Sequence, residues 1–371
     1  MKPAVSILIP NWNGTELLKQ FLPSVLAAAG RYGAAAHAAV EVIVVDDGST
    51  DGSVSHLREL GFRERAEEPA APGEDTGIAR RLVVNEKNLG FSAACSRGFA
   101  AARHPLVFLL NNDVEVDVDC LEPLVQNFQD PSVFAAHCHA FEFRTGKECG
   151  TGKLGGFRRG FLRVHGSYAP KPAATSGGNL PLRSMFAGGG SAMFDREKWR
   201  QLGGFEPLLA PAYWEDVEIG YRAWKRGFTV LYEPRSIVRH RVSSTLDGKR
   251  LRRVQERNRL IYHWIHLHDS RFLFSHIIWV NLLAFSAPLR FQAGFLLSCW
   301  AALRRLPEIR KRRREERLAA KRSDREVLRL FTELSRHPGI TVYGGGGEGT
   351  RKGRPGATPT GPSFTPGVRP Q

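Results

Sequence analysis

Three apolar segments that each end in polar residues constrain the fold of this chain most. Residues 106–110 are consecutive apolar residues, too few for a helix and without alternation, so they predict a strand buried on both faces of a parallel sheet. Residues 42–45 end in Asp46-Asp47-Gly48, and residues 5–9 end in Pro10-Asn11-Trp12-Asn13-Gly14. Because ligands bind at the carboxyl ends of such strands, the polar tips predict an active-site edge.

The segments around these tips alternate between strand and helix. Strands are predicted at 5–9, 42–45, 82–84 and 106–110, with helices at 16–29, 53–60 and 91–102 between them. This rhythm is typical of an α/β fold with a mostly parallel central sheet. Residues 119–240 break the rhythm and are expected to shape the acceptor side. Each tip alone is also ordinary turn and capping chemistry, and the argument for a site is that three coincide.

Length and cysteine usage indicate a globular protein of a reducing compartment. The chain has 371 residues with 42% hydrophobic content, and its N-terminus lacks the pattern of a signal peptide. Five cysteines at irregular spacing do not make a disulfide framework. His137-Cys138-His139 with Cys149 offers soft metal ligands, but successive strand residues point to opposite faces, which disfavours a zinc site.

The basic charge is concentrated near the C-terminus, where it follows two apolar segments. The net charge is +16, and residues 304–329 hold twelve Lys/Arg against five Asp/Glu. Segments 272–288 and 291–303 are shorter than the ~20 apolar residues that span a bilayer. We therefore predict a helical membrane-associated region at 266–336 that contacts an anionic cytoplasmic membrane surface, and no nucleic acid. The protein is then cytoplasmic and peripherally attached to the inner face of the plasma membrane. The alternative is a helical cap packed on the main domain, and residues 337–371 predict a disordered tail.

Five motifs in a fixed order carry a family resemblance. They are residues 5–14, residues 44–51 (Val-Val-Asp-Asp-Gly-Ser-Thr-Asp), residues 88–91 (Asn-Leu-Gly-Phe), residues 109–113 (Leu-Leu-Asn-Asn-Asp) and residues 214–216 (Trp-Glu-Asp). Over residues 4–265 the chain resembles family 2 glycosyltransferases, and most closely the bacterial rhamnosyltransferase-like members that extend cell-surface polysaccharides. The resemblance implies a GT-A fold at 1–265, with a nucleotide-binding half at 1–118 and an acceptor half at 119–265. It also implies a nucleotide-diphosphate sugar donor, a glycan or lipid-linked acceptor, a divalent metal and inversion at the anomeric carbon.

The resemblance assigns the nucleotide-sugar contacts to the strand tips and the loop before the third helix. These contacts are Pro10, Asn13, Asp46, Asp47, Asn88, Gly90 and Asn112. Which of Asp46 and Asp47 accepts a hydrogen bond from the base stays open. Ser96 stands where the family usually has an asparagine, which leaves contacts from that helix in doubt.

The resemblance assigns the metal to Asp113 and His240. A hard carboxylate suits Mg²⁺ or Mn²⁺ bridging two phosphate oxygens. The family's D-x-D motif reads Asn111-Asn112-Asp113 here. Because the first carboxylate is missing, metal binding is expected to depend on the phosphates of the donor.

The resemblance assigns the catalytic base to Asp216, with Glu215 as the alternative. Carboxylates also cap helix N-termini, which is the structural explanation for the same residues. Gly189 and Gly190 are expected to line the donor-sugar or acceptor cleft, and Trp214 to stack on a sugar ring. Trp199 and Tyr213 are further stacking candidates, although Trp199 lies within a predicted helix and fits a core position equally well.

Two rival functions fit parts of the sequence. A nucleotidyltransferase would carry a basic Gly-rich loop after the first strand, and Asn11-Trp12-Asn13-Gly14 is not such a phosphate cradle. A catalytically degenerate protein that acts as a basic membrane-binding module would explain the charge and the missing carboxylate at position 111. The retained Asp113, Asp216 and His240 argue against it.

Overall fold

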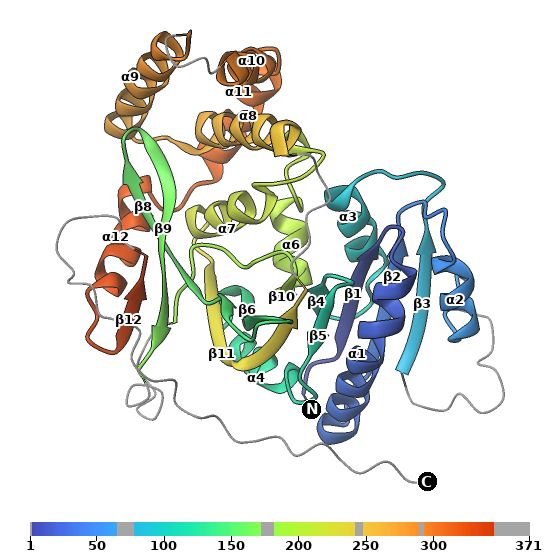
Figure 1. The fold of residues 1–371 in the computed structure, drawn as a ribbon. Coiled ribbons are helices and arrows are strands. Elements are labelled where there is room, and N and C mark those ends of the chain that lie inside the picture. Colours follow the sequence, from blue (N-terminus) through green and yellow to red (C-terminus); the bar gives the residue numbers. More distant parts are fainter. Residues whose placement is uncertain (1, 65–77, 172–181, 242–247, 289–292, 345–371) are drawn as a thin grey trace.

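The computed structural model describes residues 2–64, 78–171, 182–241, 248–288 and 293–344 (Figure 1). Within this part of the chain a nine-stranded sheet runs in the order β3-β2-β1-β4-β10-β6-β11-β5, with β7 paired to β6. A second sheet has the order β12-β9-β8. Helices cover the large sheet on both sides, so its central strands are buried on both faces.

The first half of the chain confirms the predicted strand–helix alternation. Its strands β3, β2, β1 and β4 pair in parallel. The elements are β1 (Val5–Asn11), α1 (Thr15–Ala36), β2 (Val40–Asp46), α2 (Ser53–Glu59), β3 (Ile78–Val84), α3 (Phe91–Ala101) and β4 (Leu106–Leu110). Every residue of β2 and β4 is buried, as the unbroken apolar runs require.

The second half is mixed. Strand β10 runs antiparallel to both β4 and β6, β11 runs parallel to β6, and β5 runs antiparallel to β11. The parallel character of the sheet therefore belongs mainly to strands β1 to β4. The elements are β5 (Val114–Val116), α4 (Leu121–Gln126), β6 (Val133–Glu142), β7 (Glu148–Gly150), β8 (Gly152–Arg158), β9 (Phe161–Pro170), β10 (Ser191–Asp195), α6 (Arg196–Leu202), α7 (Glu215–Lys225) and β11 (Thr229–His240), with short 3-10 helices at Asn127–Gln129 and Pro207–Leu209.

The C-terminal region is helical, as predicted, but its last elements belong to the main core. The elements are α8 (Gly248–His266), α9 (Ser270–Ser286), α10 (Ala293–Leu303), α11 (Leu306–Ala319), α12 (Asp324–Ser335) and β12 (Ile340–Tyr343). Val327 and Phe331 of α12 are fully buried in the same hydrophobic cluster as Tyr221 and Trp224 of α7.

The structure differs from the predicted boundaries in two places. Part of the region predicted at 266–336 packs on the main domain, because Val327 and Phe331 of α12 are buried in its core, and the membrane association of the region stays a prediction. The tail predicted at 337–371 begins too early, because Ile340–Tyr343 pair with β9 as an edge strand. Residues 345–371 lie outside the described part of the chain.

A buried carboxylate fixes α12 to α7. Asp324 Oδ1 accepts from the Tyr221 hydroxyl at 2.6 Å and from Lys225 Nζ at 2.8 Å. Its Oδ2 accepts from the backbone amides of His268 and Asp269. The charge of Lys225 and these donors outweigh the cost of burial and lower the pKa of Asp324.

Among the described residues, no helix combines the length and the apolar character needed to cross a membrane.

Candidate active site

A chain of hydrogen bonds joins three strand tips. Asn11, at the end of β1, donates from Nδ2 to Asp46 Oδ2 at 2.9 Å, and its Oδ1 accepts from Asn112 Nδ2 at 2.7 Å. Asp46 also accepts from the backbone amide and hydroxyl of Ser49. A Cβ at Gly14 would overlap both Asn11 Oδ1 and Asn112 Nδ2, so only glycine leaves this chain undisturbed. The predicted clustering of the three tips is confirmed by these contacts.

Asp47 organises the loop before α3. Its carboxylate accepts from Asn85 Nδ2 at 2.7 Å and from the backbone amides of Leu89 and Gly90. Gly90 has a φ of 89°, in the left-handed region that favours glycine. Asn88 is exposed, and its Oδ1 accepts from the Gly90 amide at 3.0 Å. Both carboxylates thus accept hydrogen bonds from backbone amides. A contact of either Asp46 or Asp47 with the nucleotide base stays a prediction.

Residues 10–13 present a polar and aromatic surface at the end of β1. The Asn13 side chain accepts from the Thr50 amide at 2.7 Å, which ties the β1 tip to the β2 tip. Pro10 is half-buried within β1. Trp12 is 47% exposed, and the sequence analysis did not single it out. An exposed indole beside two polar tips is a stacking surface for a base, which the unusual Asn-Trp-Asn spacing could have signalled.

The structure brings the two predicted metal ligands together. Asp113 Oδ1 and His240 Nε2 lie 3.1 Å apart, because β5 and β11 pair with His240 opposite Val114. Asp113 is buried and His240 half-buried. Within the described part of the chain, no group of three or more His, Cys, Asp or Glu residues could hold a metal. One carboxylate and one imidazole fit a divalent ion that takes its remaining ligands from a diphosphate and water.

Glu215 and Asp216 begin α7 and form an electrostatically coupled pair. Burial, followed by the charge of Asp216, raises the pKa of Glu215 to about 8. Burial also raises the pKa of Asp216, against the backbone amides of Val217 and Gly189 and the charge of Lys153, which favour the ionised form. Asp216 therefore ionises before Glu215, and an ionised carboxylate beside a protonated one can accept a proton from a hydroxyl group.

The predicted glycine turn lies between Asn111 and the predicted base Asp216. Gly190 accepts from the Asn111 amide at 3.0 Å, and a Cβ on Gly190 would lie 2.8 Å from Asn111 Nδ2. A Cβ on Gly189 would lie 4.0 Å from the Asp216 Cβ. The backbone at 189–190 thus runs between Asn111 and Asp216, and the predicted cleft position of both glycines fits this geometry.

The three predicted stacking aromatics differ in their surroundings. Trp199 lies in the core, stacked on Phe99 with ring centroids 3.7 Å apart, so the stacking role proposed for it is wrong. Trp214 is half-buried and packs on Tyr262 of α8 at 5.4 Å. Tyr213 and Trp214 both have positive φ, 71° and 77°, which is uncommon for large side chains. Such strained backbone directly before a proposed base is typical of functional sites.

Two residues near the base escaped the sequence analysis. Asn258 of α8 is fully buried, and its Nδ2 donates to the carbonyls of Leu209, Ala212 and Tyr213, which fixes the loop before α7. Lys153 of β8 is half-buried, and burial lowers its pKa while the charge of Asp216 opposes this shift. Both act through contacts between segments far apart in the chain, so no local pattern marks them.

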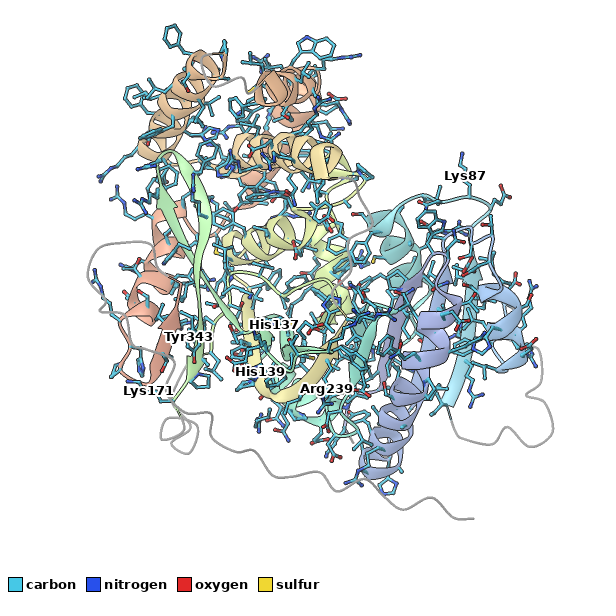
Figure 2. The ribbon with its side chains drawn as sticks, viewed as in Figure 1. Lys87, His137, His139, Lys171, Arg239 and Tyr343 are labelled. Carbon is cyan, nitrogen blue, oxygen red and sulfur yellow. The ribbon has the colours of Figure 1, made fainter. Side chains whose placement is uncertain are left out.

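The cysteine–histidine cluster has other contacts. His137 Nε2 lies 3.0 Å from Ser184 Oγ, and burial lowers the pKa of His137 to about 3. His139 pairs with Glu148 at 3.0 Å. Figure 2 shows His137 and His139 on β6 together with Arg239 of β11, whereas Lys87, in the loop before α3, lies on the far side of the molecule from Tyr343.

The chain is similar to known glycosyltransferases. Residues 6–202 match the family model described as Glycosyl transferase family 2, and residues 106–310 match that of Glycosyl transferase family group 2. A Nostoc protein described as an uncharacterized glycosyltransferase is 30% identical over 36% of this chain and 36% of its own length. A dodecaprenyl-phosphate galacturonate synthase from Rhizobium johnstonii is 28% identical over 34% of this chain and 32% of its own length. The chain thus spans about a third of the length of the curated relatives it matches.

A solved structure has the same fold. The crystal structure of GalNAc-T7 with UDP, GalNAc and Mn²⁺ matches with a TM-score of 0.53, 17% sequence identity, and coverage of 77% of this chain and 57% of that chain. This likeness confirms the predicted GT-A fold.

Proposed function

Because the chain belongs to glycosyl transferase family 2, we propose that it moves a sugar from a nucleotide-diphosphate donor to a hydroxyl group, with inversion at the anomeric carbon. The observation that carries this proposal is the pair Asp113–His240, joined through Asn111 and the turn at 189–190 to Asp216. The proposed diphosphate-binding pair and the proposed base then lie on either side of the turn at 189–190.

The chain's own residues divide the chemistry as follows. The strand tips at Asn13 and Asp46 or Asp47, with the loop at Asn88 and Gly90, bind the nucleoside, and Trp12 stacks on the base. Asp113 and His240 would hold Mg²⁺ or Mn²⁺, and the ion would neutralise charge on the diphosphate.

Asp216 removes the proton from the acceptor hydroxyl while that oxygen attacks the anomeric carbon from the face opposite the diphosphate. The C–O bond to the diphosphate breaks as the new glycosidic bond forms. No covalent sugar–enzyme intermediate is needed, unlike the two-carboxylate retaining mechanism.

Substrates and location are further parts of the proposal. The resemblance to rhamnosyltransferase-like enzymes makes rhamnose the first donor sugar to test. The Rhizobium johnstonii relative is described as a dodecaprenyl-phosphate galacturonate synthase, and this description favours a lipid-linked acceptor. Such an acceptor requires the protein to work on the inner face of the plasma membrane, where anionic lipids attract its net charge of +16.

A nucleotide panel tests the binding half of the proposal. Thermal unfolding is measured with UDP, dTDP, GDP and CMP, each with and without Mn²⁺ or Mg²⁺. One nucleotide at about 100 times its Kd should stabilise the folded state by about 2.7 kcal/mol. Asp113→Ala should abolish the metal-dependent part, whereas Asp119→Ala, an exposed acid paired with Arg31, should not.

Transfer assays test the catalytic half. Asp216→Asn should keep nucleotide binding and lose transfer, and NMR of the product should show the inverted anomer. A retained anomer would rule out the direct displacement. If the wild type binds no nucleotide and transfers no sugar, the result would favour the alternative function, a catalytically degenerate protein that binds membranes.

A further inference from the structure

Helix α9 is mostly apolar on its outer face as well as on its inner one, and exposed Asn281, which donates to the Ile277 carbonyl, is a polar residue of the outer face. Phe274 and Phe285 are 67% and 81% exposed, and Ile277, Ile278 and Leu282 lie on the same exposed side. After Arg271 the helix contains no charged residue. A helix that is apolar all round is normally buried, so the outer face of α9 lacks the cover that its composition calls for.

Helix α10 extends this face. Leu296, Leu297, Trp300 and Leu303 are exposed, with Trp300 at 59%, and α10 contains no charged residue. The inner sides of α9 and α10 share one hydrophobic cluster with α8, and both helices lie at the same end of the molecule (Figure 1). We call these exposed side chains of the two helices the α9–α10 face.

The body of the protein holds α9 firmly. His276 is buried and its Nδ1 lies 2.7 Å from the Gly160 carbonyl in the turn between β8 and β9. A Cβ at Gly160 would lie 2.6 Å from the Trp279 Cβ, so turn and helix are closely packed. The turn between β8 and β9 therefore fixes the position of α9 at His276 and Trp279.

Arginines surround the α9–α10 face. Exposed Arg271 begins α9, and exposed Arg304 and Arg305 follow α10. Arg304 lies over the Trp300 ring at 4.7 Å, and Arg159 lies over the Trp279 ring at 5.9 Å. Tryptophan and arginine at the rim of an apolar surface are typical of the headgroup level of a membrane.

The basic run that follows contributes less than its sequence predicts. Arg312 binds Glu206, Glu315 and Glu316, and Arg313 donates to the carbonyls of Trp264 and Leu267. These arginines hold α11 against the main domain and are not a free cationic surface.

We propose that the α9–α10 face inserts into the interfacial layer of an anionic lipid bilayer, while the surrounding arginines bind lipid headgroups. Charge complementarity selects this occupant over a second copy of the chain. A symmetric dimer through this face would bring the two sets of arginines together, and like charges oppose that contact. The inference deepens the proposed function, because it identifies the surface by which the enzyme would reach a lipid-linked acceptor.

Vesicle flotation of the full chain tests the inference. The wild type should float with phosphatidylcholine vesicles that contain phosphatidylglycerol, and less with pure phosphatidylcholine or at high salt. The variant Ile278→Glu/Phe285→Glu/Trp300→Glu should bind at least about 100-fold more weakly, because each substitution replaces a large apolar side chain by a charge. The matched control Val118→Glu/Leu318→Glu/Val342→Glu changes three exposed apolar residues outside the face and should float like the wild type.

Two further readouts separate the possible outcomes. Brominated lipids should quench tryptophan fluorescence, and Trp300→Phe should keep binding but lose most of that quenching. The nucleotide thermal shift should be the same in both triple variants, which separates a failure of docking from a failure of the proposed function. Equal flotation of both triple variants overturns the inference. So does a wild type that fails to float but dimerises in sedimentation velocity through this face.

Discussion

Replacing Glu215 by glutamine should change how stability depends on pH. Burial and the charge of Asp216 raise the pKa of Glu215 from 4.5 to about 8 in the folded protein, whereas in the unfolded chain it keeps the ordinary value. Between these values the folded state binds more protons than the unfolded state. The contribution of neutral Glu215 to the free energy of unfolding is therefore fully present below pH 4.5 and is lost as the pH rises towards 8.

The size of this effect follows from the two pKa values. A difference of roughly 3.5 units at about 1.4 kcal/mol each gives about 5 kcal/mol of unfolding free energy. Water entry and relaxation on ionisation make this an upper bound. Glutamine keeps the shape of the side chain without its charge, so Glu215→Gln should be more stable than the wild type above pH 8 and differ little near pH 5.

Urea unfolding from pH 5 to 9 measures the effect. The matched control is Glu16→Gln, which removes an exposed glutamate from the first turn of α1 and should follow the wild-type curve. Because Glu215 is already neutral in the wild type where Asp216 ionises, Glu215→Gln should leave the rise of the pH–rate profile in place. Parallel stability curves for wild type and Glu215→Gln would refute the raised pKa of Glu215.

Three other substitutions test the packing around the site. Gly14→Ala should weaken nucleotide binding by about tenfold, measured by calorimetry, because the new Cβ displaces Asn112 and loses about one hydrogen bond. Asn258→Ala should lower kcat, and lower the unfolding free energy by about 2–4 kcal/mol, because it releases three loop carbonyls; transfer assays and urea unfolding measure the two effects. Asp324→Asn should cost about 3–5 kcal/mol in urea unfolding, because Lys225 stays buried without its counter-charge.

The nucleotide half was predictable because its information is local. Strand β4 has the predicted bounds, 106–110, and all its residues are buried. A short apolar run bounded by turn residues has few alternatives to a buried strand. Because parallel strands end at one edge of the sheet, the polar residues that follow them are expected at that same edge. The pairing of Asp113 with His240 was predicted from the family resemblance alone. The two residues are 127 positions apart in the chain, and the pairing of β5 with β11 brings them together.

The C-terminal elements were not predictable in the same way. The partner of β12 is β9, which precedes it by about 170 residues, and three of the four β12 side chains are exposed. A short edge strand of this kind has no periodic signal of its own. Arg312 and Glu206 show the same limit, because a charge count cannot tell an internal ion pair from a solvated surface.

Helix α8 connects the loop before α7 with α10. Its Asn258 fixes that loop, while the Arg253 carbonyl accepts from Ser298 of α10. Because one continuous helix carries both contacts, the fold sets the distance between this loop and a bilayer that receives the α9–α10 face. A lipid-linked acceptor would then reach Asp216 at a fixed distance from its membrane anchor. The selectivity of the enzyme for acceptor length would reside in this spacing, outside the motifs that define the family.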